Sequence, residues 1–174
     1  MMHFSLDFSD FMDRIGNVPI NDNNIYNSRK NYRRIIDIMR LSINEILMKA
    51  NEIEDADKRR EFLYQNDSVA LRTILKYCYD PAIEWLLPKG PAPYKPSVFP
   101  DSHGMLYNES RKLYIFVRGG NDNLTKVRRE QLFINLLESI DKDDAELLVS
   151  IKDRKLPYKL LTKKFIEKAF PGLI

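Results

Sequence analysis

Apolar residues recur at helical intervals along most of this chain, with polar residues between them. From Ser28 onward their spacing of three and four residues predicts a helix with one apolar face, formed by Ile35, Ile36, Met39, Ile43, Ile46 and Leu47. Two shorter helices are predicted over 55–66 and 67–80. The second has candidate inward positions at Val69, Leu71, Leu75 and Cys78.

The second half repeats the helical pattern. A short helix is predicted over 82–87, with Trp85 as a core anchor. A long core helix is predicted over 124–140, where Leu132, Phe133, Leu136, Leu137 and Ile140 share a face. The next helix is expected to begin with a capping box of Asp143 and Glu146. The segment 113–117 fits a strand or a helix. The fold class predicted is therefore all-α, a compact multi-helix domain.

Two segments depart from this pattern. Residues 1–28 combine Phe4, Phe8 and Phe11 with aspartates and turn-forming residues, which indicates an irregular N-terminal arm. It is either packed on the domain or mobile, or it is a segment that docks on a replication or other protein through Phe4, Phe8 and Phe11. A proline-rich connection over 88–104 interrupts the domain proper, 29–174.

Composition adds little until charge is followed along the chain. A length of 174 residues with 44% hydrophobic content fits one ordinary domain. The formal net charge of the whole chain is only +3. Positive charge is concentrated in two places: residues 151–174 hold seven Lys or Arg against two acidic residues, and residues 29–40 hold five against one. Such basic patches favour a phosphate-bearing partner.

Signals for catalysis or cofactor binding are weak. The two histidines, His3 and His103, do not have metal-ligand spacing with the single cysteine, Cys78. The glycines at 119–120 belong to no phosphate-binding or dinucleotide motif, and helix capping explains the acidic residues at 141–146. We predict no enzymatic activity, no metal and no cofactor. A lone cysteine and short apolar runs lead us to expect a cytoplasmic protein that does not enter the membrane.

Two predicted helix starts carry the candidate phosphate contacts. Lys126, Arg128 and Arg129 lie in the first turns of one helix, where cations oppose the helix dipole unless an anion is bound. At the start of the last helix, cations cluster with hydroxyl groups, a combination typical of proteins that bind the DNA backbone. This second set consists of Arg154, Lys155, Tyr158, Lys159, Thr162 and Lys163. Lys159 and Lys163 are expected to share one face of that helix.

The end of the chain, LLVSIKDRKLPYKLLTKKFIEKAFPGLI, resembles the end of the N-terminal DNA-binding domain of ATP-dependent DNA ligases, especially those of T-even-type phages. Residues 43–89 look like the opening helices of that domain, and residues 123–148 are similar to its later helix pair. The resemblance covers about residues 41–174. The Pro-Gly-Leu-Ile ending is its most specific element.

This resemblance implies an all-helical domain that contacts the minor groove and phosphates of double-stranded DNA, intact or nicked. By position, it implies contacts at Thr125, Lys126 and Arg128, and at the six residues of the last helix start. It also implies a place in phage replication, repair or genome handling, and so in the host cell cytoplasm. Ligases carry a Lys-x-Asp-Gly nucleophile motif that is absent here, so we expect a stand-alone, non-catalytic relative.

One further departure leaves an alternative open. The family's turn before the last helix is rich in small residues, whereas this chain has the bulky sequence LPYKLL at 156–161. The alternative is a protein-interaction module on the same fold that has lost DNA binding.

Overall fold

The computed structural model describes residues 40–97 and 104–174. The chain separates into two units, Met1–Ile36 and Asp37–Ile174, and all described residues belong to the second. The predicted arm, with Phe4, Phe8 and Phe11, lies outside the described residues, as does the boundary predicted after residue 28.

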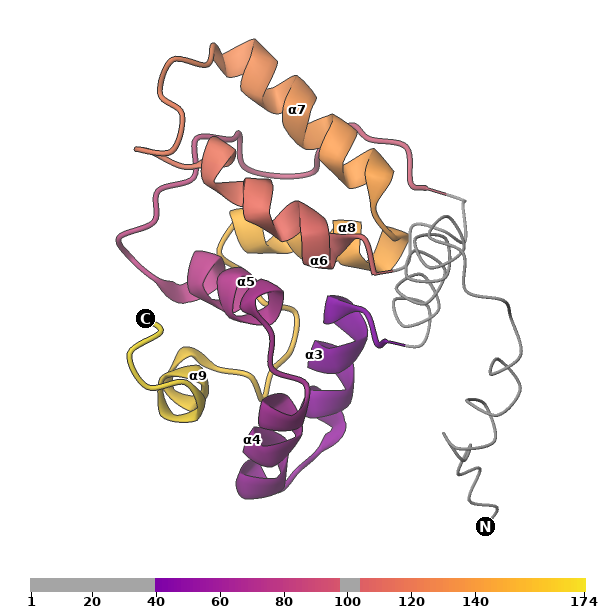
Figure 1. Cartoon of the computed structure of the whole chain (residues 1–174), viewed down its shortest axis with the longest axis vertical. Coiled ribbons are helices and arrows are strands. Elements are labelled where there is room, and N and C mark those ends of the chain that lie inside the picture. Colours follow the sequence, from indigo (N-terminus) through magenta and orange to yellow (C-terminus); the bar gives the residue numbers. More distant parts are fainter. Residues whose placement is uncertain (1–39, 98–103) are drawn as a thin grey trace, which may run out of the picture. The chain divides into compact units, whose positions relative to one another are not determined.

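The described part is helical, which confirms the predicted all-α class. Its α-helices are α3 (Ile43–Glu52), α4 (Ala56–Gln65), α5 (Val69–Tyr79), α6 (Leu106–Glu109), α7 (Lys126–Ser139), α8 (Lys142–Lys152) and α9 (Lys163–Ala169). A 3-10 helix, η2 (Ser110–Phe116), continues α6. Figure 1 shows α5, α6 and α8 in the middle of this unit, with α7 on one side and α4 and α9 on the other.

The core forms where α5 packs against α6, η2 and α8. Leu71, Leu75 and Cys78 are buried there, as predicted. Val69 was predicted to face inward and is 77% exposed, because it is the first residue of α5 and precedes the apolar stripe. Burying large aliphatic side chains stabilises a domain by about 1.5–3 kcal/mol each, so this shared interior holds the helices in place.

Helix starts differ from the sequence pattern at two places. The helix predicted from Ser28 is not continuous: residues 40–42 are not helical, and α3 begins after Ser42, which forms a capping box with Glu45. At α8 the cap is Asp141, whose side chain accepts a hydrogen bond from the Asp143 backbone, so the predicted capping box of Asp143 and Glu146 was wrong. In both cases an N-cap side chain determines the residue at which the helix begins, and apolar spacing alone does not identify that residue.

Buried Asp144 links two of these helix starts. Its Oδ1 accepts a hydrogen bond from the backbone of Asn44 at 2.8 Å, so the first turn of α8 holds the first turn of α3. The side chain is fully buried. A carboxylate at the N-terminal end of a helix also interacts favourably with the helix dipole.

Two further predictions concern the middle of the chain. The helix predicted over 82–87 does not form; this segment is extended, and Trp85 pairs in an isolated bridge with Val117. Trp85 is half-buried against the core and donates its indole N–H to the Tyr77 carbonyl at 3.1 Å. The ambiguous segment 113–117 ends the 3-10 helix at Phe116 and then becomes extended.

We call residues 80–97 the strap, because they cross from α5 over the ends of η2 and α8. Backbone hydrogen bonds join Leu86 to Phe116 and Arg118 to Glu84, at 2.8 and 2.9 Å. At the end of α8, buried Lys152 donates to the Gly90 carbonyl at 2.6 Å. These contacts fix the strap to two helices that are far apart in the sequence.

The last helix docks through aromatic contacts. The Phe170 ring lies edge-on to Tyr64 of α4, with ring centroids 5.7 Å apart. The Arg72 guanidinium of α5 lies 5.3 Å from the centre of the Phe170 ring. Tyr79 of α5 donates its hydroxyl to the Leu161 carbonyl at 2.5 Å. The chain that carries the C-terminal lysines is therefore held by α4 and α5.

Candidate nucleic-acid interface

The start of α7 presents two of the predicted cations to solvent. Thr125 is the N-cap, and its hydroxyl accepts a hydrogen bond from the Arg128 backbone at 3.3 Å. Lys126 is exposed and lies 4.0 Å from the Glu130 carboxylate, a weak surface pair. Arg128 is exposed and has no ion pair among the described residues. Of the predicted α7 contacts, Lys126 and Arg128 are thus the accessible charges.

Arg129 lies on a different face of the same turn and is buried, with 6% exposure. Its guanidinium donates to the Ile115 carbonyl at 3.2 Å and to the Asn121 carbonyl at 2.9 Å. It therefore joins α7 to η2 and to the preceding turn, and its charge is not presented to a phosphate. Helical spacing explains the difference, because adjacent residues point about 100° apart.

Arg154 also serves the fold. It adopts a left-handed backbone conformation, with φ of 59°, just after α8. Its guanidinium donates to the carbonyls of Asp80 and Ile83 in the strap. The charge is exposed, but these donors are directed at the strap, so the phosphate contact predicted for Arg154 stays a prediction.

Tyr158 has a similar structural role. Its hydroxyl lies 2.6 Å from Oδ1 of Asn44 in α3, and the ring is half-buried against the core. Burial raises the pKa of this hydroxyl above its usual value. The hydroxyl predicted to face DNA instead ties the turn before α9 to α3.

The remaining cations of this region are exposed. We call residues 155–168 the basic segment; its lysines are Lys155, Lys159, Lys163, Lys164 and Lys168. Lys163 lies 3.9 Å from Glu167, and the other four have no ion pair with any residue that the structure describes. Both backbone groups of Leu160 are held: its N–H donates to Asn51 at 2.9 Å, and its carbonyl accepts from Arg59 at 3.3 Å.

Thr162 caps α9, accepting a hydrogen bond from the Phe165 backbone at 3.3 Å. Because the helix begins only at Lys163, Lys159 lies in the turn before it. The prediction that Lys159 and Lys163 share a helix face was therefore wrong. The two lysines instead lie on either side of the cap.

The strap links the two groups of predicted contacts. Glu84 forms a two-point ion pair with Arg118, at 2.6 and 2.7 Å, while the neighbouring Ile83 carbonyl accepts from Arg154. The turn that leads to α7 and the turn that follows α8 thus meet at adjacent strap residues. Hydrogen bonding to Arg118 lowers the pKa of Glu84 below its usual value. Sequence spacing does not predict this junction, because Arg118 is 34 residues from Glu84 and Arg154 is 71 residues from Ile83.

Lys164 and Lys168 were not among the predicted contacts, although both are exposed in α9. The excess of basic residues over 151–174 could have identified both lysines as candidate contacts. Arg40, from the other basic stretch, places its guanidinium 3.7 Å above the Tyr107 ring. The remaining cations of residues 29–39 lie outside the described residues.

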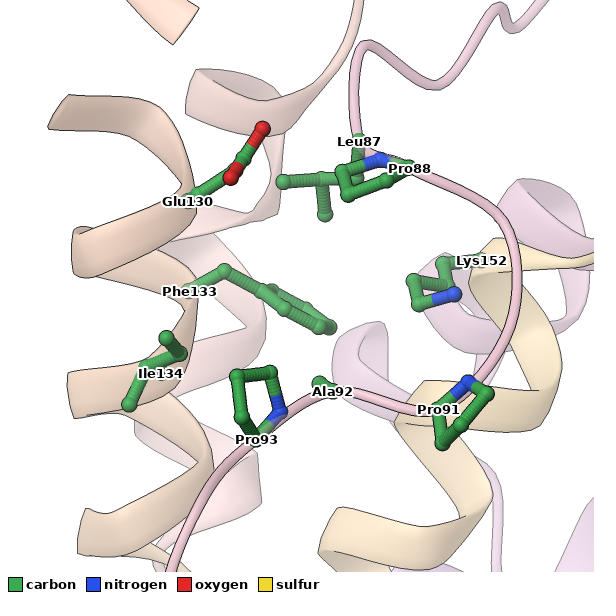
Figure 2. Close-up of a pocket in the computed structure, with 9 residues that line it drawn as sticks. All are labelled: Leu87, Pro88, Pro91, Ala92, Pro93, Glu130, Phe133, Ile134 and Lys152. Carbon is green, nitrogen blue, oxygen red and sulfur yellow. The ribbon is translucent and has the colours of Figure 1, made fainter. Parts of the chain in front are cut away.

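A cavity of about 70 Å³ lies between the strap and α7. Figure 2 shows the Phe133 ring of α7 and the Lys152 side chain of α8 pointing into it from opposite sides, with Pro91 and Pro93 of the strap along one edge. Pockets for small molecules are usually about 300–1,000 Å³, so this cavity is too small for a nucleotide.

Within 40–97 and 104–174, no group of three or more His, Cys, Asp or Glu side chains is arranged to hold a metal ion. None of the helices in these ranges is both long enough and apolar enough to cross a membrane.

Residues 46–158, well over half of the chain, match the family of unknown function DUF6433. The protein belongs to this family. The matched stretch runs from α3 to Tyr158 and so includes the start of α7, the strap and the first part of the basic segment. No curated protein and no solved structure matches the chain.

Proposed function

We propose that this DUF6433 protein is a non-catalytic DNA-binding protein that contacts the backbone and minor groove of a duplex, intact or nicked, and acts in phage replication, repair or genome handling. The observation that carries the proposal is the basic segment. Four exposed lysines there have no ion pair within the described chain: Lys155, Lys159, Lys164 and Lys168. The resemblance of residues 41–174 to the DNA-binding domain of phage ligases supports the same function.

The anchoring of the basic segment favours binding. Leu160 is held at both backbone groups, and Tyr158 is tied to α3, so the lysines project from an ordered backbone. Less conformational entropy is lost on binding when the backbone is already fixed. Lysines that neutralise phosphates also release counterions, which makes the affinity steeply dependent on salt.

The start of α7 supplies a second group of contacts. Lys126 and Arg128 are exposed, and their turn is joined through the strap to the turn after α8. Arg129, Arg154 and Tyr158 are left out of the proposed interface, because each holds one part of the fold to another.

Lysine acetylation read by mass spectrometry tests this interface. The protein is acetylated briefly at low salt with and without an excess of a 20-base-pair duplex. We expect DNA to protect Lys155, Lys159, Lys164 and Lys168. Lys49 and Lys95 are internal controls, since both are exposed and lack ion pairs with described residues but lie outside the basic segment.

Equal acetylation of all six lysines with and without DNA, or protection of the two controls alone, would overturn the proposal. Repeating the reaction with a nicked duplex determines whether the same lysines respond to a break in one strand.

A second candidate is a protein-interaction module on this fold. It is favoured by the use of Arg129 and Arg154 as internal ties, which leaves fewer charges for DNA than the sequence suggested. A groove of about 290 Å³ between η2 and α7, lined by Ile115, Phe116 and Leu132 among others, offers an apolar surface for such a role. Failure of the acetylation test would leave this candidate.

A further inference from the structure

Each proposed contact region also exposes one aliphatic side chain beside its cations. Val127 is 78% exposed and lies between exposed Lys126 and Arg128. Leu160 is 39% exposed and follows exposed Lys159. Isolated apolar residues on a surface need no explanation. The same combination occurs in both candidate contact regions: an exposed aliphatic side chain next to a cation that has no ion pair with a described residue. This repetition is more informative than one isolated apolar residue.

Neither side chain can easily turn inward. Val127 lies in the first turn of α7, and that turn is held in its orientation by buried Arg129. The backbone of Leu160 is held by Asn51 and Arg59. Both aliphatic groups are therefore presented to solvent from a fixed backbone.

We propose, on the basis of the function proposed above, that Val127 and Leu160 pack against deoxyribose in the minor groove of B-form DNA while the adjacent cations hold the flanking phosphates. A surface that carries both cations and aliphatic groups complements this groove, where charged phosphates border apolar sugar edges. Proteins that bind the minor groove frequently place apolar side chains in it, although there the side chains enter between base steps. The substrate class is therefore duplex DNA in preference to duplex RNA.

Discrimination against RNA follows from the sugar. Duplex RNA has a shallow minor groove lined with 2′-hydroxyls. An aliphatic side chain placed against a 2′-hydroxyl would bury it without a hydrogen-bond partner, which is unfavourable. Deoxyribose has no such group, so the same contact is favourable in DNA.

The chain contains a matched control. Val69 is 77% exposed in the first turn of α5, much as Val127 is in α7. Its nearest basic residue along the helix, Arg72, is bound to Asp67 at 2.5 Å. Val→Thr is nearly isosteric and replaces a methyl group with a hydroxyl, so Val127→Thr and Val69→Thr differ mainly in location.

The experiment measures anisotropy of labelled 20-base-pair DNA and RNA duplexes of one sequence, with the full chain and the variants Val127→Thr, Leu160→Asn and Val69→Thr. Thermal unfolding of each variant is measured as a check on folding. We expect the wild type to prefer DNA. Val127→Thr and Leu160→Asn should each weaken DNA binding about fivefold, as expected for loss of about 1 kcal/mol of apolar contact, without changing its salt dependence.

The outcomes separate this inference from the function on which it rests. If DNA binds but the two variants match Val69→Thr, or if they weaken DNA and RNA binding equally, the sugar contact is refuted and backbone binding stands. A wild-type preference for RNA also refutes it. If the wild type binds neither duplex at low salt, the proposed function and this inference fail together.

Discussion

Arg128 and Arg129 are adjacent, yet the structure assigns them opposite roles, and this contrast can be measured. Arg129 is buried and donates to two carbonyls, whereas Arg128 is exposed and has no ion pair in the described ranges. Replacing each with methionine keeps most of the aliphatic chain and removes the donors. Arg129→Met should destabilise the protein, and Arg128→Met should not.

The magnitude follows from the two lost hydrogen bonds. A hydrogen bond from a charged donor contributes about 1.5–3 kcal/mol, but methionine avoids the cost of burying the guanidinium. We therefore expect Arg129→Met to lower the free energy of unfolding by about 2–3 kcal/mol in total. With a urea m-value of about 2 kcal/mol/M, the unfolding midpoint would fall by roughly 1–1.5 M.

Urea denaturation followed by circular dichroism measures this directly, with wild type, Arg128→Met and Arg129→Met compared under the same conditions. Arg128→Met should lie within about 0.5 kcal/mol of wild type, as is usual for exposed substitutions. The reasoning is refuted if Arg129→Met is equally mild, or if Arg128→Met is as destabilising as Arg129→Met.

Three further predictions concern stability and reactivity. A Cβ at Gly120 would lie 1.7 Å from the Tyr114 carbonyl oxygen, so Gly120→Ala should lower the free energy of unfolding by about 3 kcal/mol or more, measured by urea denaturation. Gly119 has open space around it but a φ of 81°, so Gly119→Ala should lower it by about 1–2 kcal/mol. A larger loss for Gly119→Ala than for Gly120→Ala would contradict this packing. Partial burial opposes ionisation of Asp153, but hydrogen bonds from Lys152 and the Gly90 N–H lower its pKa below the usual value overall. Its ionised form therefore stabilises the fold above about pH 4, the contribution is lost as pH falls through the folded-state pKa, and Asp153→Asn should flatten the acid side of a stability-pH curve. Cys78 is 2% exposed, and burial raises the pKa of its thiol to about 11. At pH 8 a disulfide reagent should therefore react with this thiol only after the protein opens, and fast reaction in the native protein would show that α5 is not packed as described.

Helices with a strong apolar stripe could be predicted from sequence. Leu136 and Leu137 of α7, and Leu71 and Leu75 of α5, are buried as their spacing predicted. Periodicity was sufficient because these positions face a shared core. It did not predict the extended strap, since the segment around Trp85 is held by hydrogen bonds to Phe116 and Arg118 rather than by local helical preference.

The candidate site was predicted less completely. The sequence shows where cations lie along the chain but not where their donors point. Arg129 and Arg154 differ from Arg128 and Lys155 through contacts with distant carbonyls, and a pattern in the sequence cannot show such contacts. Thr125 and Thr162 were predicted as contacts and are helix caps, so their hydroxyls already accept backbone hydrogen bonds.

The salt dependence of DNA binding tests the central proposal most directly. Anisotropy of a 20-base-pair duplex would be measured at several salt concentrations for wild type, Lys159→Ala/Lys164→Ala and the control Lys49→Ala/Lys95→Ala. Contacts from Lys126, Arg128 and the four lysines of the basic segment that have no ion pair with a described residue predict a slope of log K against log salt of about −5. The magnitude of the slope should fall by about 2 in the first variant and stay unchanged in the control. Absence of binding at low salt, or the same slope in all three proteins, would contradict DNA binding by the basic segment.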